Sequence, residues 1–385
     1  MKKILIFSTD DFLPPAGGAE IAISEITKRL PEFEFDFFCA RIRKNTSVFE
    51  KVNNVNIYRI GLGIPKIDKY LLAFFGHRRA LKIHKKTPYN LVWAVMASYG
   101  GFAAVRFKKK TGVPFLLTLQ EGDPLESIER KVRFGSGYFK NIFVRADGLQ
   151  AISNFLYDWG QKMGFAGKIA KVVPNGVDIA NFTRQFSQQE ILETRNSFGF
   201  KKDALILVTA SRLEKKNGIG DVIAALKILP EKVCFAICGF GSLEEQLKRQ
   251  VKNLGLENRV KFLGMVTHES LSKILKACDV FIRPSLTEGL GSSFLEAMAA
   301  GPIVIGTMVG GIPDFLKEGI TGFVCRPENS QSIASAVTKI MSLNNLELVR
   351  IRSYALDLVK KEYNWDFVSK KMEDIFNQLI GASVR

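Results

Sequence analysis

Glu288 and Glu296 stand eight residues apart, where a loop containing Gly289 and Gly291 runs into a segment with helical spacing. Glycine allows backbone turns that are closed to other residues. A helix that begins after such a loop directs its unpaired N–H groups outwards, which suits anions and hydroxyl groups. An ionised carboxylate accepts hydrogen bonds from two hydroxyl groups at once, so this pair predicts a site for a polyhydroxyl ligand.

The alternative is a surface helix with solvated glutamates, which are favourable near helix N-termini. The flanking segments argue against it, because residues 280–285 and 302–306 have the pattern of short buried strands. These strands would place both glutamates beyond the carboxyl ends of a parallel sheet, where open α/β sheets bind ligands.

Residues 277–301, ACDVFIRPSLTEGLGSSFLEAMAAG, resemble the nucleotide-sugar site of retaining glycosyltransferases of family 4, whose signature is this E-x7-E pair. The resemblance recurs in order along nearly the whole chain. It implies the α/β fold called GT-B, in which two Rossmann-like domains face each other across a cleft. It also implies that Glu296 holds ribose hydroxyl groups. The implied contacts of the donor sugar are Glu288 and the N–H groups of Gly289, Leu290 and Gly291.

The composition fits a cytoplasmic protein of two domains. A chain of 385 residues is too long for one compact core, and 46% hydrophobic with 24% charged residues is ordinary for a globular protein. The five cysteines include no C-x-x-C pair, which favours buried thiols in a reducing compartment. The N-terminus reads as a first strand and not as a signal peptide, and no stretch is expected to cross a membrane.

Positive charge is concentrated in the first half of the chain. The formal net charge is +17, and residues 1–180 hold 28 Lys and Arg against 16 Asp and Glu. Such an excess invites phosphate-bearing substrates, an acidic membrane surface or nucleic acid. Nucleic acid is the disfavoured partner, because the basic residues cluster without an aromatic-interleaved motif.

Short apolar segments alternate with helical ones in both halves, which predicts parallel sheets. We expect an acceptor-side domain over residues 1–178 and a nucleotide-sugar domain over 179–365. Residues 366–385 are amphipathic. The resemblance implies that this last segment forms a helix that crosses back to the first domain.

Two places in the first half could bind ligand. Gly17 and Gly18 precede a helix and resemble the N-terminal glycine loop of the family, which would present N–H groups to a phosphate. Glu121 and Asp123 follow a predicted strand, where they would bind or deprotonate an acceptor hydroxyl, or else only cap a turn. Gln120 stands where many relatives carry histidine, so a histidine at the reaction centre is not supported.

Residues 68–86 combine Leu71, Leu72, Phe74 and Phe75 with five later lysines and arginines. A basic helix with an apolar face can lie on an anionic bilayer at the inner side of the membrane. The alternative is an internal helix that packs its apolar face and leaves its charges solvated. Membrane docking would fit a lipid-linked acceptor.

Arg212 follows a predicted buried strand, and Lys216 comes shortly after it. Together they could clamp a diphosphate, because guanidinium binds two oxygens at once and ammonium adds a point charge. The family has lysine five residues after this arginine, where the present chain has Asn217. Either the loop shifts to bring Lys216 in, or Lys215 serves instead. The alternative is that these basic residues are merely solvated.

The nucleoside part of the donor would bind nearby. Gly239 and Gly241 resemble the G-x-G segment of the family, which lets the backbone pass close to base or ribose. Val266 lies in the stretch whose backbone reads the nucleobase in relatives. Neither segment indicates which base is bound.

We therefore predict a retaining glycosyltransferase that moves a sugar from a nucleotide diphosphate sugar to a hydroxyl acceptor, such as a glycan or lipid-linked glycan of the cell envelope. The resemblance implies no obligatory metal, and the sequence has no D-x-D motif. The alternatives are a GT-B nucleotide-sugar epimerase and a basic membrane- or nucleic-acid-binding module. A requirement for a second, acceptor substrate distinguishes the transferase from the epimerase.

Overall fold

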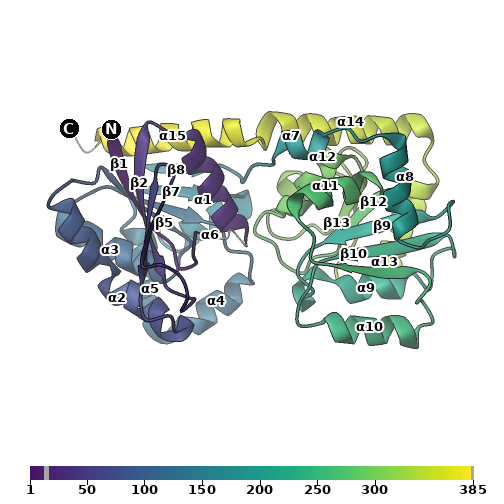
Figure 1. The fold of residues 1–385 in the computed structure, drawn as a ribbon, viewed down its shortest axis with the longest axis horizontal. Helices are drawn as coiled ribbons and strands as arrows, with labels where there is room; N and C mark the ends of the chain where they lie inside the picture. The colour runs from purple at the N-terminus through teal and green to yellow at the C-terminus, as the bar shows by residue number, and fades with distance from the viewer. Residues whose placement is uncertain (13–16, 383–385) are drawn as a thin grey trace. The chain divides into compact units, whose positions relative to one another are not determined.

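The computed structural model describes residues 1–12 and 17–382, and the chain divides into two compact units (Figure 1). Unit 1 comprises Met1–Gly176 and the C-terminal segment that begins at Trp365, and unit 2 comprises Val177–Asn364. The first domain was predicted to end at residue 178 and the C-terminal segment to begin at 366. In the structure the first part of unit 1 ends at Gly176, and its second part begins at Trp365.

Unit 1 is an eight-stranded sheet with helices between its strands. The strand order is β3-β4-β2-β1-β5-β6-β7-β8, and every neighbouring pair except β3 with β4 is parallel. The strands are β1 (Lys2–Phe7), β2 (Phe33–Ala40), β3 (Phe49–Val52), β4 (Val55–Ile60), β5 (Leu91–Val95), β6 (Phe115–Leu119), β7 (Gly148–Ala151) and β8 (Ile169–Val172). The helices are α1 (Gly18–Arg29), α2 (Pro65–His84), α3 (Tyr99–Thr111), α4 (Leu125–Lys131), the 3-10 turn η1 (Arg133–Gly135), α5 (Ser136–Val144), α6 (Asn154–Lys162) and α15 (Trp365–Ala382).

The C-terminal helix α15 belongs to the core of unit 1. It packs beside α1, and one face of it buries Trp365, Met372 and Phe376. The ring centroid of Phe376 lies 5.2 Å from that of Trp93 in β5. Burial of several large apolar side chains, each worth about 1.5–3 kcal/mol, holds this remote segment in unit 1.

Unit 2 is a second, six-stranded sheet in which all neighbouring strands are parallel, in the order β11-β10-β9-β12-β13-β14. Its strands are β9 (Leu205–Ala210), β10 (Val233–Cys238), β11 (Val260–Gly264), β12 (Val280–Arg283), β13 (Ile303–Gly306) and β14 (Phe323–Val324). Its helices are α7 (Ile179–Thr183), α8 (Gln188–Ser197), the 3-10 turn η2 (Lys215–Asn217), α9 (Ile219–Ala225), α10 (Glu244–Asn253), α11 (His268–Lys276), α12 (Ser292–Ala300), η3 (Ile312–Asp314), α13 (Ser330–Met341) and α14 (Asn345–Glu362).

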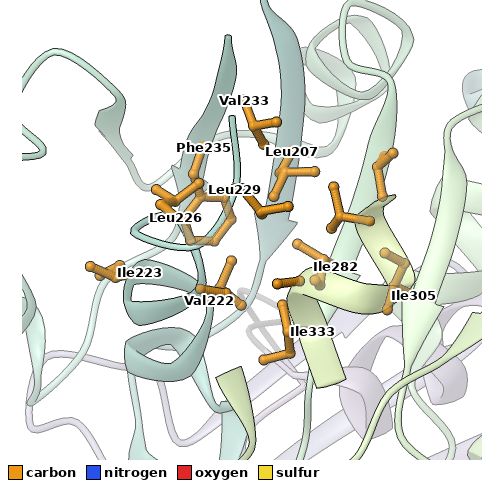
Figure 2. Close-up of a cluster of buried hydrophobic side chains, with 14 of the residues drawn as sticks. Leu207, Val222, Ile223, Leu226, Leu229, Val233, Phe235, Ile282, Ile305 and Ile333 are labelled. Atoms are coloured by element: carbon orange, nitrogen blue, oxygen red, sulfur yellow. The ribbon is translucent and has the colours of Figure 1, made fainter. Parts of the chain in front are cut away.

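The strands of unit 2 are nearly continuous apolar runs because helices cover the sheet. Figure 2 shows one resulting cluster, in which Leu207 of β9, Phe235 of β10 and Ile282 of β12 gather with Val222 of α9 and Ile333 of α13. All five side chains are fully buried. This packing fixes the strand ends, and therefore the loops that follow them.

Each sheet has a switch point, the place where the strand order reverses and where open α/β sheets bind ligands beyond their carboxyl ends. The switch point of unit 1 lies between β1 and β5, and that of unit 2 lies between β9 and β12. Within the described residues, no helix is both long and apolar enough to span a bilayer.

Candidate active site

The switch point of unit 2 brings together the two loops that were predicted to bind the diphosphate and the sugar of the donor. One loop follows β9 and carries Arg212 and Lys216, and the other follows β12 and carries Glu288. The backbone N–H of Leu286 donates to the carbonyl oxygen of Lys216 at 2.7 Å. The predicted diphosphate clamp and the predicted sugar-binding loop are therefore braced against each other.

Glu288 is held on both its backbone and its side chain. Its carbonyl oxygen accepts the N–H of Gly311 at 3.2 Å, which ties the loop to the segment after β13. Its Oε2 accepts a hydrogen bond from Nη2 of Arg283 at 2.5 Å. The side chain of Glu288 keeps 18% of its surface exposed, so a ligand can still reach it.

The helix α12 begins directly after this loop, as predicted. Gly291 is its N-cap residue and has φ 97°, a conformation that side-chain-bearing residues rarely adopt. Within the described residues, the N–H groups of Leu290 and Gly291 have no hydrogen-bond partner. The side chain of Leu290 is buried, and Gly289 before it is buried as well. The loop thus offers backbone donors at the N-terminal end of a helix.

Glu296 lies one turn into α12 and its side chain is 13% exposed. Burial raises the pKa of this carboxyl, and the charges of His268 and Arg283 oppose that rise. Nε2 of His268 lies 4.0 Å from Oε1 of Glu296, and the imidazole packs edge-on against the ring of Phe182. A half-buried carboxylate beside a histidine suits the binding of neutral hydroxyl groups.

The loop after β9 shows why the chain has Asn217 where the family has a lysine five residues after the arginine. Asn217 is buried, and its Nδ2 donates to the carbonyl oxygen of Arg212 at 2.6 Å. It therefore acts as an internal brace of the loop, whereas Lys216 before it is half-buried. The guanidinium of Arg212 is exposed and has no ion pair within the described part of the chain.

Gly239 and Gly241 allow the loop after β10 to pack on the backbone of the loop after β9. Gly239 has φ 136°, and a Cβ atom there would lie 1.8 Å from the carbonyl oxygen of Ser211. Its N–H donates to the carbonyl oxygen of Gly264 at 2.7 Å. Val266, half-buried, follows two residues later. The glycines therefore have a packing role, whatever they contribute to a nucleoside.

The glycine loop of unit 1 differs from its expected form. Gly17 is the N-cap residue of α1, and the carboxylate of Glu20 lies beside it, since a Cβ atom at Gly17 would lie 2.6 Å from Oε2 of Glu20. A side-chain carboxylate thus lies at the end of α1 that was expected to face a phosphate. Gly18 lies beside the amide of Asn175. The first part of this predicted loop, residues 14–16, lies outside the described residues.

Glu121 lies inside unit 1 and does not cap α4. Its side chain accepts the N–H of Ala97 at 2.7 Å through Oε1, while Oε2 is buried and has no hydrogen-bond partner within the described residues. Burial raises its pKa to about 7. Asp123 is exposed. Gln120 accepts a hydrogen bond from Asn175 at 3.2 Å, so the side chain in the family's histidine position is anchored.

The basic helix α2 presents only part of the predicted apolar face to solvent. Leu72 is fully buried and packs inwards, which corrects its assignment to the membrane-facing side. Phe74 and Phe75 are 50% and 45% exposed. Guanidinium groups of Arg106 and Arg78 lie over these two rings, each 4.8 Å from the ring centroid.

Two polar residues of the site were not predicted from the sequence. Arg283 is the last residue of β12 and contacts Glu288, and His268 begins α11 beside Glu296. Arg283 could have been found from the sequence, because it is an arginine at the end of an otherwise apolar buried strand. No sequence pattern marked His268, because its approach to Glu296 depends on the packing of α11 against α12.

Two family models match the chain, one on each side of its middle. Residues 16–181 match Glycosyltransferase Family 4, and residues 190–356 match Glycosyl transferases group 1. The second match contains the diphosphate loop and both glutamates of the site.

Individual proteins agree with these models. An uncharacterized glycosyltransferase, MJ1069 of Methanocaldococcus jannaschii, is 26% identical over 99% of this chain and 100% of its own. The amylovoran biosynthesis glycosyltransferase AmsK of Erwinia amylovora is 30% identical over 46% of this chain and 45% of its own. The structure of Anabaena HepE in complex with UDP-glucose superposes with a TM-score of 0.79, at 21% identity, over 98% of this chain and 100% of that one. The predicted GT-B fold class is thereby confirmed, and the chain belongs to the family 4, group 1 glycosyltransferases.

Proposed function

We propose that this enzyme transfers a sugar, with retention of anomeric configuration, from a nucleotide diphosphate sugar to a hydroxyl acceptor. The observation that carries the proposal is the arrangement at the switch point of unit 2. There Glu288 and the N-terminal end of α12 lie on a loop that is hydrogen-bonded to the loop of Arg212 and Lys216. Glu296, one turn further on, is the proposed partner of the ribose hydroxyl groups.

The diphosphate would be neutralised by protein cations. Arg212 is exposed and pairs with no carboxylate in the described part of the chain, so its guanidinium can bind two phosphate oxygens. Lys216 is the proposed second cation. Fixed cations at the position where charge develops on a leaving group stabilise the transition state strongly. We propose on this basis that the reaction has no obligatory metal.

The chemical step exchanges one bond for another at the anomeric carbon. The bond from this carbon to the leaving phosphate oxygen breaks, and a bond to the acceptor oxygen forms on the same face. The acceptor proton passes to the leaving diphosphate, so no further base is required. Glu288 and the N–H groups of Leu290 and Gly291 would hold the sugar hydroxyl groups during this step.

The acceptor is proposed to bind at the carboxyl edge of the unit 1 sheet, near Glu121 and Asp123. A glycan or lipid-linked glycan of the cell envelope is the proposed class, and AmsK, a relative, is named for amylovoran biosynthesis. For a lipid-linked acceptor, α2 offers Phe74 and Phe75 beside arginines, a combination that suits an anionic bilayer surface. Co-sedimentation with anionic vesicles tests this, and absence of binding by the folded protein would exclude it.

A binding screen tests the donor site. UDP, GDP and ADP, each with and without a common sugar, are titrated calorimetrically into the wild-type protein, Glu296→Gln and a control, Glu245→Gln, whose side chain is 73% exposed in α10. One nucleotide should stabilise the wild type and the control. Glu296→Gln should bind that nucleotide at least about tenfold more weakly. Equal affinity in all three proteins would remove Glu296 from the site.

A further inference from the structure

Arg283 is a nearly buried arginine at the end of β12, with a side chain only 8% exposed. Its three nitrogens donate to three different parts of the site. Nε reaches Oγ of Ser285 at 3.2 Å, Nη1 reaches Oγ of Ser293 at 2.8 Å, and Nη2 reaches Oε2 of Glu288 at 2.5 Å. One planar group thus connects the strand end, the glutamate loop and the first turn of α12.

The surroundings hold this guanidinium in one orientation. Its Cζ lies 4.8 Å from the ring centroid of Phe294, so the aromatic ring covers one face of the cation. A Cβ atom at Gly291 would lie 3.4 Å from Nη2 and 3.3 Å from Cγ of Glu288. The glycine at the start of α12 therefore keeps clear the space in which the ion pair forms.

Removing an arginine from water is costly unless its charge and its donors are matched by partners. Here the bond to Glu288 uses Oε2, and no group within the described residues donates to Oε1. The bond to Arg283 therefore fixes the direction in which the other oxygen, Oε1, points. The guanidinium itself is too buried to be the main contact of a ligand. Its charge also reaches Glu296, where it opposes the rise in pKa.

We propose that Arg283 is a positioning residue of the donor site, which fixes Glu288 so that Oε1 faces the hydroxyl groups of the donor sugar. This inference rests on the proposed function, which assigns Glu288 to the sugar and Glu296 to the ribose. It follows that loss of Arg283 weakens recognition of the sugar and turnover, but leaves binding of the nucleoside diphosphate nearly intact.

The test compares Arg283→Lys with Glu288→Gln, the double variant and a matched control, Arg259→Lys. Lysine keeps the charge but cannot bond Ser285, Ser293 and Glu288 from one plane. The control arginine is partly buried in the same unit and donates to the carbonyl oxygens of residues 229 and 230 before β10 and of Val233, the first residue of β10. Calorimetry measures the affinities for UDP and UDP-glucose, GDP and GDP-mannose, and ADP and ADP-glucose. Nucleotide release measures the slow hydrolysis of the bound sugar donor.

Arg283→Lys should bind the nucleoside diphosphate with an affinity within about threefold of the wild-type value. The dissociation constant of the sugar donor, divided by that of the nucleotide, should rise at least about tenfold, and the hydrolysis rate should fall at least about tenfold. The double variant should be no slower than Glu288→Gln, because Arg283 acts through Glu288. Arg259→Lys should match the wild type. Equal loss of nucleotide and sugar-donor binding in Arg283→Lys, additive losses in the double variant, or wild-type behaviour of Arg283→Lys would each overturn the inference. A wild-type protein that binds none of the nucleotides would refute the proposed function itself, and the inference with it.

Discussion

Replacing Glu121 by glutamine should remove a pH dependence of stability that its buried carboxyl imposes on unit 1. Burial is the largest cause that raises the pKa of Glu121 from 4.5 to about 7, and the N–H of Ala97 only partly offsets it. Since Oε2 is buried without a hydrogen-bond partner within the described residues, the folded protein favours the neutral carboxyl.

The sign and size of the effect follow from this shift. A carboxyl whose pKa is higher in the folded than in the unfolded state stabilises the fold fully below the unfolded value, and that stabilisation is lost as pH rises towards the folded value. For Glu121 the window runs from pH 4.5 to about 7. At 1.36 kcal/mol per pH unit, the loss is about 3 kcal/mol. Glutamine is neutral throughout, so the variant lacks this component.

Urea unfolding measures the difference between the two proteins. All three tryptophans, Trp93, Trp159 and Trp365, are buried in unit 1, so their emission follows the unfolding of that unit. The free energy of unfolding of the wild type minus that of Glu121→Gln should fall by about 3 kcal/mol between pH 4.5 and 8. Glu126→Gln, which changes an exposed carboxyl of α4, should leave the wild-type pH dependence unchanged. Parallel curves for the wild type and Glu121→Gln would show that the carboxyl of Glu121 has the same pKa in the folded and unfolded protein, contrary to this prediction.

Three further predictions concern unit 2. Gly239→Ala should lower the melting temperature and weaken nucleotide binding at least about tenfold, because its Cβ would clash with the Ser211 carbonyl oxygen at 1.8 Å; unchanged calorimetric affinity would contradict this. Leu207→Ala, at a fully buried position, should cost about 2–5 kcal/mol of unfolding free energy by circular dichroism, and a loss well below that range would mean that the core relaxes to fill the cavity. Glu296→Ala and Arg212→Ala should each lower turnover at least about a hundredfold in a nucleotide-release assay without changing the fold, and near-normal rates in both would refute the site.

The sequence allowed the fold class and the position of the glutamate pair to be predicted, because both depend on local patterns. Buried apolar strands lie before Glu288 and after Glu296 in the sequence. The loop that follows the first of these strands must therefore lie at the carboxyl edge of a parallel sheet. The amphipathic pattern of the last segment likewise agrees with the burial of one face of α15 in unit 1.

Side-chain partners could not be predicted in the same way, because they depend on distances between segments. Gly17 and Gly18 were expected to face a phosphate, yet the carboxylate of Glu20 lies beside Gly17. Asn217 looked like a missing lysine, yet it braces the loop through the carbonyl oxygen of Arg212. No sequence pattern marked His268, yet it lies beside Glu296. In each case the pattern gave the backbone position, and the three-dimensional packing gave the role.

The most direct test of the account is the anomeric configuration of the glycoside formed from the donor that the binding screen identifies. Proton NMR of the reaction with a hydroxyl acceptor should show a product with the same configuration as the donor, formed only when the acceptor is present and lost in Glu288→Gln. An inverted product would contradict the proposed mechanism. Conversion of the donor into an epimer without any acceptor would contradict the assignment of this enzyme's reaction as sugar transfer.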